Sequence, residues 1–264
     1  MGSFTNDFFA NFYKRILQVS GTTNSGVTTS AKQVEDGAGN KSCVYLSDDQ
    51  LLVRPVNDES VAIFQCRGAG GTPLLQVDST NNLVKVGVSA VSSTTQYAHF
   101  GVGSAESAAM LADTHYMIPF NKGTVQTFSD LAIGTGTDPD DNYGVSTTAD
   151  GVTNALWYVP DDITIDAVHW FHAGDDATGD TVRAHLMSYS IDTSNTFRSG
   201  DMGSGVVIAD GVDIVNLGYE QIYYQSMTIQ SANVSAGRVI AFVFRSDSVN
   251  SDFSINATVK YHIR

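Results

Sequence analysis

The clearest pattern in this chain is CVYLSDDQLLVRPVNDESVAIFQCRGAGGTPLLQVDSTNNLVKVGVSA, residues 43–90, within a ladder of short apolar runs that spans residues 41–96. Each run is closed by turn-forming residues, such as Asp48-Asp49 and the stretches 68–71 and 78–82. Because these turns interrupt every run before a helix could nucleate, the pattern predicts strands. The predicted strands are residues 44–46, 51–53, 61–64, 74–77 and 83–86.

The ladder holds too few large apolar side chains to fold as a single chain. Each run supplies two or three of them. Burying one side chain gains roughly 1.5–3 kcal/mol, whereas ordering each residue costs roughly 1–2 kcal/mol. Three chains around a shared axis could bury these side chains against one another, so we expect an intertwined trimeric stem. Its predicted core residues are Leu51, Val53, Ile63, Leu75, Val77, Val84 and Val86.

The composition favours a turn-rich β protein with an acidic surface. The 264 residues are 42% hydrophobic and 16% charged, with 24 glycines and a net charge of −14. Such a surface repels phosphate backbones and anionic membranes, so we expect neither nucleic-acid binding nor membrane insertion. Cys43 and Cys66 match no metal-binding spacing, and their number fits assembly in a reducing cytoplasm.

Residues 4–19, FTNDFFANFYKRILQV, predict a helix. Its apolar side chains recur at i+4, Thr5 can cap its first turn, and Gly21 can end it. So dense an apolar stripe needs a partner surface. Because the polar face is not rich in Lys or Arg, we expect docking onto a larger assembly and not a membrane interface. The predicted docking residues are Phe4, Phe8, Phe9, Phe12, Tyr13, Ile16 and Leu17.

The pattern divides the chain into three parts. Residues 1–40 would form the anchoring helix and a polar connector, residues 41–113 the stem and a small-residue neck, and residues 114–264 a head. Longer, regularly spaced runs in the head predict a β-sandwich of the jelly-roll type. The predicted head strands are residues 115–120, 144–149, 154–159, 163–173, 181–191, 206–209, 220–229, 239–245 and 253–263.

The sequence carries no familiar catalytic motif. It has no nucleophile elbow, no phosphate-binding loop and no HExxH helix. His169 and His172 are spaced to point to opposite faces of a strand, so they cannot share a metal ion without a bulge. We therefore expect a non-enzymatic protein. The alternative is a glycan-cleaving enzyme that uses two carboxylates.

Two acidic loops and one tyrosine-rich segment are the remaining candidates for a site. Alternating Asp residues near Gly can bind Ca²⁺, but neither loop matches the EF-hand template, so solubilising charge is the preferred interpretation and no metal is predicted. Residues 219–224, YEQIYY, could form an adhesive patch for glycans or proteins, with strand packing as the preferred interpretation. The loop candidates are Asp138, Asp140 and Asp141 in one loop and Asp175, Asp176 and Asp180 in the other.

Four segments carry a family resemblance: NKSCVYLSDDQLLVRPVNDES (40–60), PLLQVDSTNNLVKVG (73–87), DDITIDAVHWFHAGDDATGD (161–180) and NATVKYHIR (256–264). In these segments the chain resembles tail-fibre, head-fibre and decoration-type virion proteins of tailed bacteriophages, especially marine ones. The resemblance implies a homotrimer on the virion surface, assembled in the host cytoplasm. Its N-terminal part would be fixed to capsid or tail proteins, and its β head would touch a host glycan or receptor. A capsid cement protein without receptor binding is the alternative.

Overall fold

A computed structural model describes residues 17–21, 26–87, 91–105, 110–121, 131–144, 152–175, 178–218, 221–248 and 252–264. The protein is mainly β and divides into two compact units, an N-terminal unit of residues 1–93 and a C-terminal unit of residues 94–264. Among the helices in the described ranges, none has the length and apolar character needed to cross a membrane.

The N-terminal unit contains two four-stranded antiparallel sheets, each with its strands in sequence order. The first sheet consists of β1 (Leu17–Val19), β2 (Lys32–Asp36), β3 (Lys41–Leu46) and β4 (Leu51–Val53). The second consists of β5 (Phe64–Arg67), β6 (Pro73–Asp78), β7 (Leu83–Val86) and β8 (Val91–Ser92). Four of the five runs predicted in the ladder are therefore confirmed as strands.

The third run of the ladder was placed too early, because residues 61–63 form a turn and the strand begins at Phe64. The Ser60 hydroxyl accepts a hydrogen bond from the backbone N–H of Ala62 at 3.2 Å, which closes this turn. A serine hydroxyl that bonds the chain two residues on competes locally with strand pairing.

The turn between β6 and β7 is held by a buried carboxylate. Asp78 Oδ1 accepts from the N–H of Asn81 at 3.0 Å, and Lys85 Nζ lies 2.6 Å from Asp78 Oδ2. The hydrogen bond from Lys85, followed by that from the Asn81 side chain, lowers the pKa of Asp78 to about 2. Asn82 has a positive φ of 55°, which Asn tolerates better than most residues. The DSTNN turn therefore fixes the register of this hairpin.

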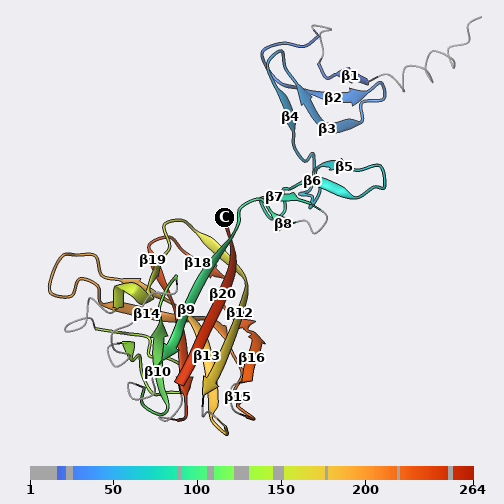
Figure 1. The fold of residues 1–264 in the computed structure, drawn as a ribbon. Helices are drawn as coiled ribbons and strands as arrows, with labels where there is room; N and C mark the ends of the chain where they lie inside the picture. The colour runs from blue at the N-terminus through green and yellow to red at the C-terminus, as the bar shows by residue number, and fades with distance from the viewer. Residues whose placement is uncertain are drawn as a thin grey trace, which may run out of the picture. The chain divides into compact units, whose positions relative to one another are not determined.

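The C-terminal unit is a sandwich of two antiparallel sheets (Figure 1). The β13 sheet has the order β10 (Thr114–Ile118), β19 (Arg238–Ser246), β13 (Thr181–Ile191), β14 (Met202–Asp210) and β17 (Thr228–Ile229), with β11 (Trp157–Tyr158) on β19 and β15 (Ile214–Val215) on β13. The β12 sheet has the order β16 (Gln221–Ser226), β12 (Ile163–Asp175), β20 (Asp252–Ile263) and β9 (Thr95–Ala105), with β18 (Asn233–Val234) on β12.

The two sheets bury one continuous apolar core between them. Trp170 on β12 lies 6.2 Å from Phe242 and 6.0 Å from Phe244 on β19, ring centre to ring centre. The ring of Phe100 on β9, at the end of the β12 sheet, lies 6.1 Å from that of Phe242. Aromatic pairs of this geometry add to the stabilisation from area burial alone.

A second core covers the outer face of the β13 sheet. Met117, Met187 and Tyr189 pack there against residues 131–133 and the segment that holds the 3₁₀ helix η3 (Thr153–Ala155). The β13 sheet is thus buried on both faces. Strand β19 is accordingly apolar on both faces and lies between β10 and β13, and the strand predicted at residues 239–245 is confirmed.

The boundary between stem and head at residue 113/114 was wrong. Strand β9 pairs with β20 along most of its length, so residues 95–105 belong to the sandwich and not to a neck, and the boundary lies at 93/94. The run of small residues hid this strand, because Gly and Ala are depleted in strands in general. The predicted strand 220–229 is interrupted between β16 and β17, which join different sheets.

The predicted strand at residues 144–149 lies outside the described residues apart from its first residue. The predicted N-terminal helix also lies almost entirely outside them, together with Phe4, Phe8, Phe9, Phe12, Tyr13 and Ile16. The predicted C-terminal end of this helix is wrong, since Leu17 begins β1 and pairs with Asp36. Leu17 is 72% exposed there.

Replacing Phe242 by Ala should destabilise the C-terminal unit by about 3–5 kcal/mol, because Phe242 is fully buried at the centre of the core. Urea denaturation followed by tryptophan fluorescence measures this, since both tryptophans of the chain, Trp157 and Trp170, lie in this unit. The matched control is Phe197→Ala, at a site 90% exposed. Its effect should stay within about 0.5 kcal/mol, and equal effects of the two changes would contradict the packing described above.

Candidate functional site

One end of the outer face of the β13 sheet is polar, although the rest of this face is apolar. Cross-strand register places His115 of β10 beside Arg245 of β19, which in turn lies beside Arg183 of β13. One row further along, His185 of β13 lies beside Asp210 of β14. Residues directly opposite one another in a sheet share a face, so four strands deliver these five side chains to one patch.

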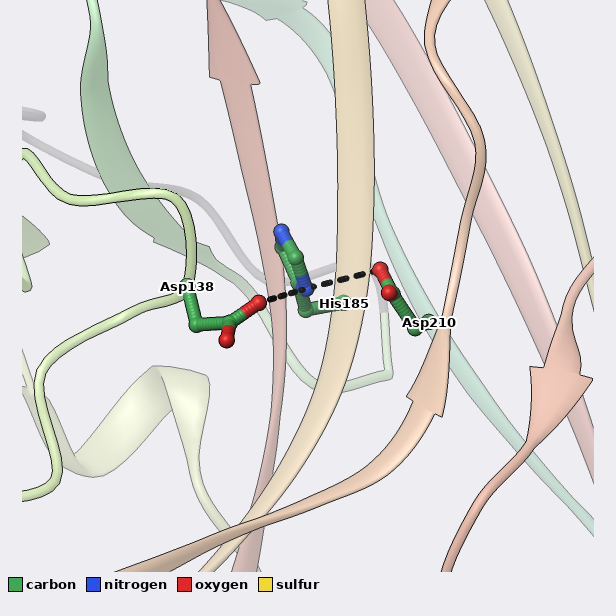
Figure 2. A group of neighbouring side chains, drawn as sticks. All are labelled: Asp138, His185 and Asp210. Carbon is green, nitrogen blue, oxygen red and sulfur yellow. Dashed lines mark ion pairs between the residues drawn. The ribbon is translucent and has the colours of Figure 1, made fainter.

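The His185 imidazole lies between two carboxylates (Figure 2). Its Nδ1 is 3.2 Å from Asp210 Oδ1 and 3.9 Å from Asp138 Oδ1. Neither contact is aligned as a hydrogen bond, and both ring nitrogens of His185 lack a hydrogen-bond partner among the described residues. The side chain of His185 is completely buried, whereas that of Asp138 is 55% exposed. The cluster therefore opens to solvent at Asp138.

The segment of residues 131–143 carries Asp138 across this face. It begins beside β10, where the N–H of His115 donates to the carbonyl of Gly134 at 2.9 Å. It continues to Asp140, whose carbonyl accepts from the Tyr189 hydroxyl at 3.0 Å. Gly134 has a φ of +89°, and a Cβ there would lie 2.3 Å from the Asp140 side chain. This positive φ favours glycine, so the local sequence helps to fix the path of the loop.

Burial keeps both histidines of the cluster neutral at pH 7. It lowers the pKa of His185 to about 4, partly opposed by the neighbouring Asp210 carboxylate. Burial also lowers the pKa of His115 to about 4, assisted by the charge that His185 gains when it is protonated and by the positive charge of Arg245. The two rings lie 5.1 Å apart in an edge-to-face arrangement. Loss of hydration is therefore the dominant cause of the lowered pKa of both histidines.

Ion pairs surround the two histidines. Arg183 donates from Nη2 to Asp210 Oδ2 at 2.7 Å and from Nε to Asp210 Oδ1 at 3.2 Å, and its Nη1 is 3.7 Å from Asp213. Arg245 pairs with Asp113 at 2.6 Å. Both guanidinium groups also line an open cavity of about 310 Å³. The bidentate Arg183–Asp210 pair fixes the orientation of the Asp210 carboxylate.

Of the candidate aspartates whose side chains the structure describes, only Asp138 lies in this cluster. The side chain of Asp140 fills the space beside Gly134, and the carbonyl of Asp141 accepts from the N–H of Gly205. Asp176 and the side chain of Asp175 lie outside what is described, and the carbonyl of Asp180 accepts from the N–H of Asn216.

Sequence reasoning missed His185 and Asp210 as partners of Asp138. No sequence motif contains His185. Its position within the apolar strand TVRAHLMSYSI indicates burial, but no spacing in the sequence links it to a loop and a neighbouring strand. The prediction that His169 and His172 point to opposite faces of a strand is confirmed. His172 is buried against Asn216, while His169 contacts Tyr224 on the opposite face.

An exposed aromatic patch lies on the outer face of the β12 sheet. Phe171 of β12 and Tyr224 of β16 are directly opposite each other, with ring centres 5.1 Å apart. The Tyr224 hydroxyl is 2.8 Å from His169 Nδ1. Tyr223, by contrast, stacks on buried His172, and Tyr219 is outside the described residues. We call His169, Phe171 and Tyr224 the aromatic patch.

The predicted stem-core residues lie on strands or beside them with partly or fully exposed side chains. Cross-strand pairs place Val77 opposite Val84, and Leu75 opposite Val86, on one face of the second sheet. Val53 and Leu51 belong to β4 of the first sheet, and Ile63 directly precedes β5. Four of the seven residues therefore share one face of the second sheet, and the stem core itself stays a prediction.

Stability of the C-terminal unit should fall as the pH drops from about 6.5 towards 4. The unfolded chain binds protons at His115 and His185 near pH 6.5, whereas the folded protein does so only near pH 4. In this window the unfolded state binds more protons, so acid favours unfolding, by about 1.4 kcal/mol for each unit of pKa difference. Urea midpoints measured by tryptophan fluorescence at pH 7.5, 6, 5 and 4.5 report the effect.

The comparison variant is the double change His115→Gln, His185→Gln. It removes both titrating groups, so its loss of stability between pH 6.5 and 4.5 should be smaller than that of the natural chain. An equal loss in both proteins would assign the acid sensitivity to carboxylates elsewhere.

Comparisons with known proteins give no family for the chain. No protein-family model matches it, and a search of curated proteins finds no match. Among solved structures, it is similar to the CBM22-1 and GH10 modules of the Clostridium thermocellum endo-1,4-β-D-xylanase 10B, complexed with xylohexaose. The two share 12% sequence identity and a TM-score of 0.24, over 62% of this chain and 29% of the other. A likeness this weak carries no argument about function.

Proposed function

We propose that this chain is a non-enzymatic structural protein of a virion surface, a homotrimeric fibre or spike of a tailed phage. Its N-terminal residues dock on capsid or tail proteins, its short sheets form the trimeric stem, and its C-terminal sandwich adheres to host or surface glycans. The observation that carries this proposal is the exposed apolar face of the N-terminal sheets.

The second N-terminal sheet has one apolar face, and its other face is mostly polar. Phe64 pairs with Val77 and Val77 with Val84, while Cys66 pairs with Leu75 and Leu75 with Val86, so all six residues share a face. Gln65, Gln76 and Lys85 form the corresponding row of the other face. Amphipathic sheets bury their apolar face against another layer.

No hydrophobic side chain is buried among the described residues of the N-terminal unit. Its fully buried side chains are polar, those of Gln33 and Asp78. In the first sheet, Leu46 and Leu51 pair directly on one face, as do Val44 and Val53. Small isolated sheets without a core are marginal in water. Identical copies that share an axis would cover both apolar faces, which supports a trimeric stem.

The topology of the C-terminal unit supports a jelly roll. Its eight long strands form two antiparallel layers, in the orders β16-β12-β20-β9 and β10-β19-β13-β14. Along the chain, β9, β10, β12 and β13 alternate between the layers, as do β19 and β20. Jelly rolls made of two such sheets are a common architecture of viral capsid and lectin domains.

The geometry of the acidic cluster supports a non-enzymatic role. Glycosidases hold two carboxylates on either side of a sugar ring. Here Nδ1 of the buried His185 lies close to both carboxylates, and the ligand atoms of all three residues lie within 4.8 Å of one another, which leaves no room for a sugar ring between Asp138 and Asp210. Trp157 and Trp170, which could have lined a sugar groove, are buried in the core.

The aromatic patch supports adhesion to glycans. Phe171 and Tyr224 are both exposed, and the neighbouring strand β20 adds Asn256 and Thr258 in register with Phe171 and His169. Aromatic faces take the apolar C–H surface of a sugar, while amide and hydroxyl groups bond its hydroxyls. A rigid sheet holds these groups in fixed positions, which reduces the entropy lost on binding.

The chain should sediment in analytical ultracentrifugation at three times its mass of 28.2 kDa. Leu51→Asp should shift this species towards monomer, because Leu51 is 65% exposed on β4 and a buried unpaired carboxylate in the assembly is costly. Leu217→Asp, at a site 77% exposed in the C-terminal unit, is the matched control and should leave the mass unchanged. A folded, stable monomer of the natural chain would overturn the proposed stem.

Tyr224→Ala should weaken retention on immobilised bacterial surface polysaccharides by about 3- to 10-fold, the range expected for one aromatic contact. Tyr158→Ala is the matched control, since Tyr158 on β11 is 56% exposed and Tyr224 55%. Surface plasmon resonance against a polysaccharide panel measures both.

If no polysaccharide is retained, or if both tyrosine variants bind like the natural chain, adhesion through the aromatic patch is wrong. The cement alternative then predicts that particles lacking residues 94–264 adsorb normally but lose resistance to heat. This separates a stabilising role from a binding role.

A further inference from the structure

We propose that Asp138, His185 and Asp210 bind a first-row divalent transition-metal ion, with Zn²⁺ or Mn²⁺ as the class of cation that the site takes. The ion would join the loop of residues 131–143 to strands β13 and β14. This inference stands apart from the proposed virion role, because it rests on the C-terminal unit alone.

The spacing of the three ligand atoms fits a shared ion. Metal–nitrogen and metal–oxygen bonds of about 2.0–2.2 Å place neighbouring ligand atoms about 3–3.5 Å apart. His185 Nδ1 and Asp210 Oδ1 are 3.2 Å apart, which falls in this range. Asp138 Oδ1 is slightly farther, at 3.9 Å from His185 Nδ1, and its side chain is partly exposed and can move inward.

The direction of these contacts also favours an ion over a hydrogen bond. A hydrogen-bond acceptor lies along the N–H axis, whereas a second ligand of a metal ion lies to the side of the nitrogen lone pair. Asp210 Oδ1 is close to Nδ1 but is not aligned as an acceptor. The ring of His185 points into the gap between the two carboxylates (Figure 2).

The environment of His185 is a second observation, independent of the two carboxylates, that points to a bound ligand. It is fully buried, and neither ring nitrogen has a hydrogen-bond partner among the described residues. Leaving a buried polar group unpaired costs about 1–3 kcal/mol, so such groups call for a ligand. Imidazole is among the commonest metal ligands in proteins and binds through one of its ring nitrogens.

The local charge balance favours a cation. Asp113, Asp210 and Asp213 pair with the guanidinium groups of Arg183 and Arg245, and Asp247 lines the same cavity as both arginines. With Asp138 beside His185, the carboxylates outnumber the two guanidinium groups, and a bound cation reduces this excess of negative charge.

Arg183 positions the Asp210 carboxylate but leaves room on its oxygens for a metal ion. It bonds both oxygens, at 2.7 Å and 3.2 Å, and a carboxylate can accept about four such contacts. Partners of this kind orient metal-binding carboxylates in many sites. The longer contact is to Oδ1, the atom that faces His185.

The donor set selects the class of ion. One imidazole nitrogen and two carboxylate oxygens suit Zn²⁺ or Mn²⁺, whereas Ca²⁺ takes six to eight oxygen ligands. The site thus differs in composition from the calcium loops considered from the sequence, and it shares only Asp138 with them.

Isothermal titration calorimetry of the tag-free full chain, stripped with a chelator, tests the proposal with Zn²⁺ and then Mn²⁺ alone as probes. We expect one saturable site per chain for at least one of these ions. Asp138→Asn should weaken its binding by at least about tenfold, because it removes a charged ligand at an exposed position where folding is not at risk.

Asp213→Asn is the matched control. It removes an equally exposed carboxylate beside Arg183 that is not one of the three ligands, so affinity should change by less than about threefold. His185→Gln, checked for folding by tryptophan fluorescence, should abolish the visible absorption that Co²⁺ gains from a nitrogen ligand.

Three outcomes would overturn the proposal. They are the absence of a saturable 1:1 site for both ions, equal loss of affinity in the Asp138 and Asp213 variants, and tighter binding of Ca²⁺ than of Zn²⁺ and Mn²⁺. A trimer that binds glycans but no metal would leave the proposed function intact, so the two proposals fail separately.

Discussion

The need to cover both faces of the β13 sheet governs the C-terminal unit. One face packs on the β12 sheet through Trp170, Phe242 and Phe244. The other face has no third sheet among the described residues, so the chain covers it with the irregular segments around residues 131–143 and 152–156. Irregular backbone over a sheet must bond its own polar groups, which here go to β10, β13 and β14.

The polar cluster is a consequence of this covering. At the end of the sheet, the loop brings Asp138 over two histidines that burial keeps neutral. Buried polar groups without partners are unfavourable, and a sheet built for stability alone would carry apolar residues there. The remaining outer face of the same sheet does carry them, at Met117, Met187 and Val243. This departure from the pattern marks the cluster as a candidate for function.

The N-terminal unit obeys the same constraint in a different way. Its strands are too short to close a core, and the apolar face with Phe64, Val77 and Val84 has no covering layer among the described residues. The C-terminal unit satisfies burial within one chain, whereas in the proposed trimer association would bury the apolar face of the N-terminal unit. Assembly and adhesion would therefore be assigned to separate units, each with its own physical requirement.

The sequence by itself determined which segments become short strands and which of their residues share a face, because turn chemistry and side-chain alternation are local. It therefore predicted most strands of the ladder, the strand at residues 239–245 and the opposite faces of His169 and His172. Only the tertiary structure decided the start of the C-terminal unit and the partners of Asp138. Strand β9 is recognised through its pairing with β20, and Asp138, His185 and Asp210 meet through the register of distant strands and the path of one loop. Register between distant strands depends on the whole packed core, and no spacing along the chain encodes it.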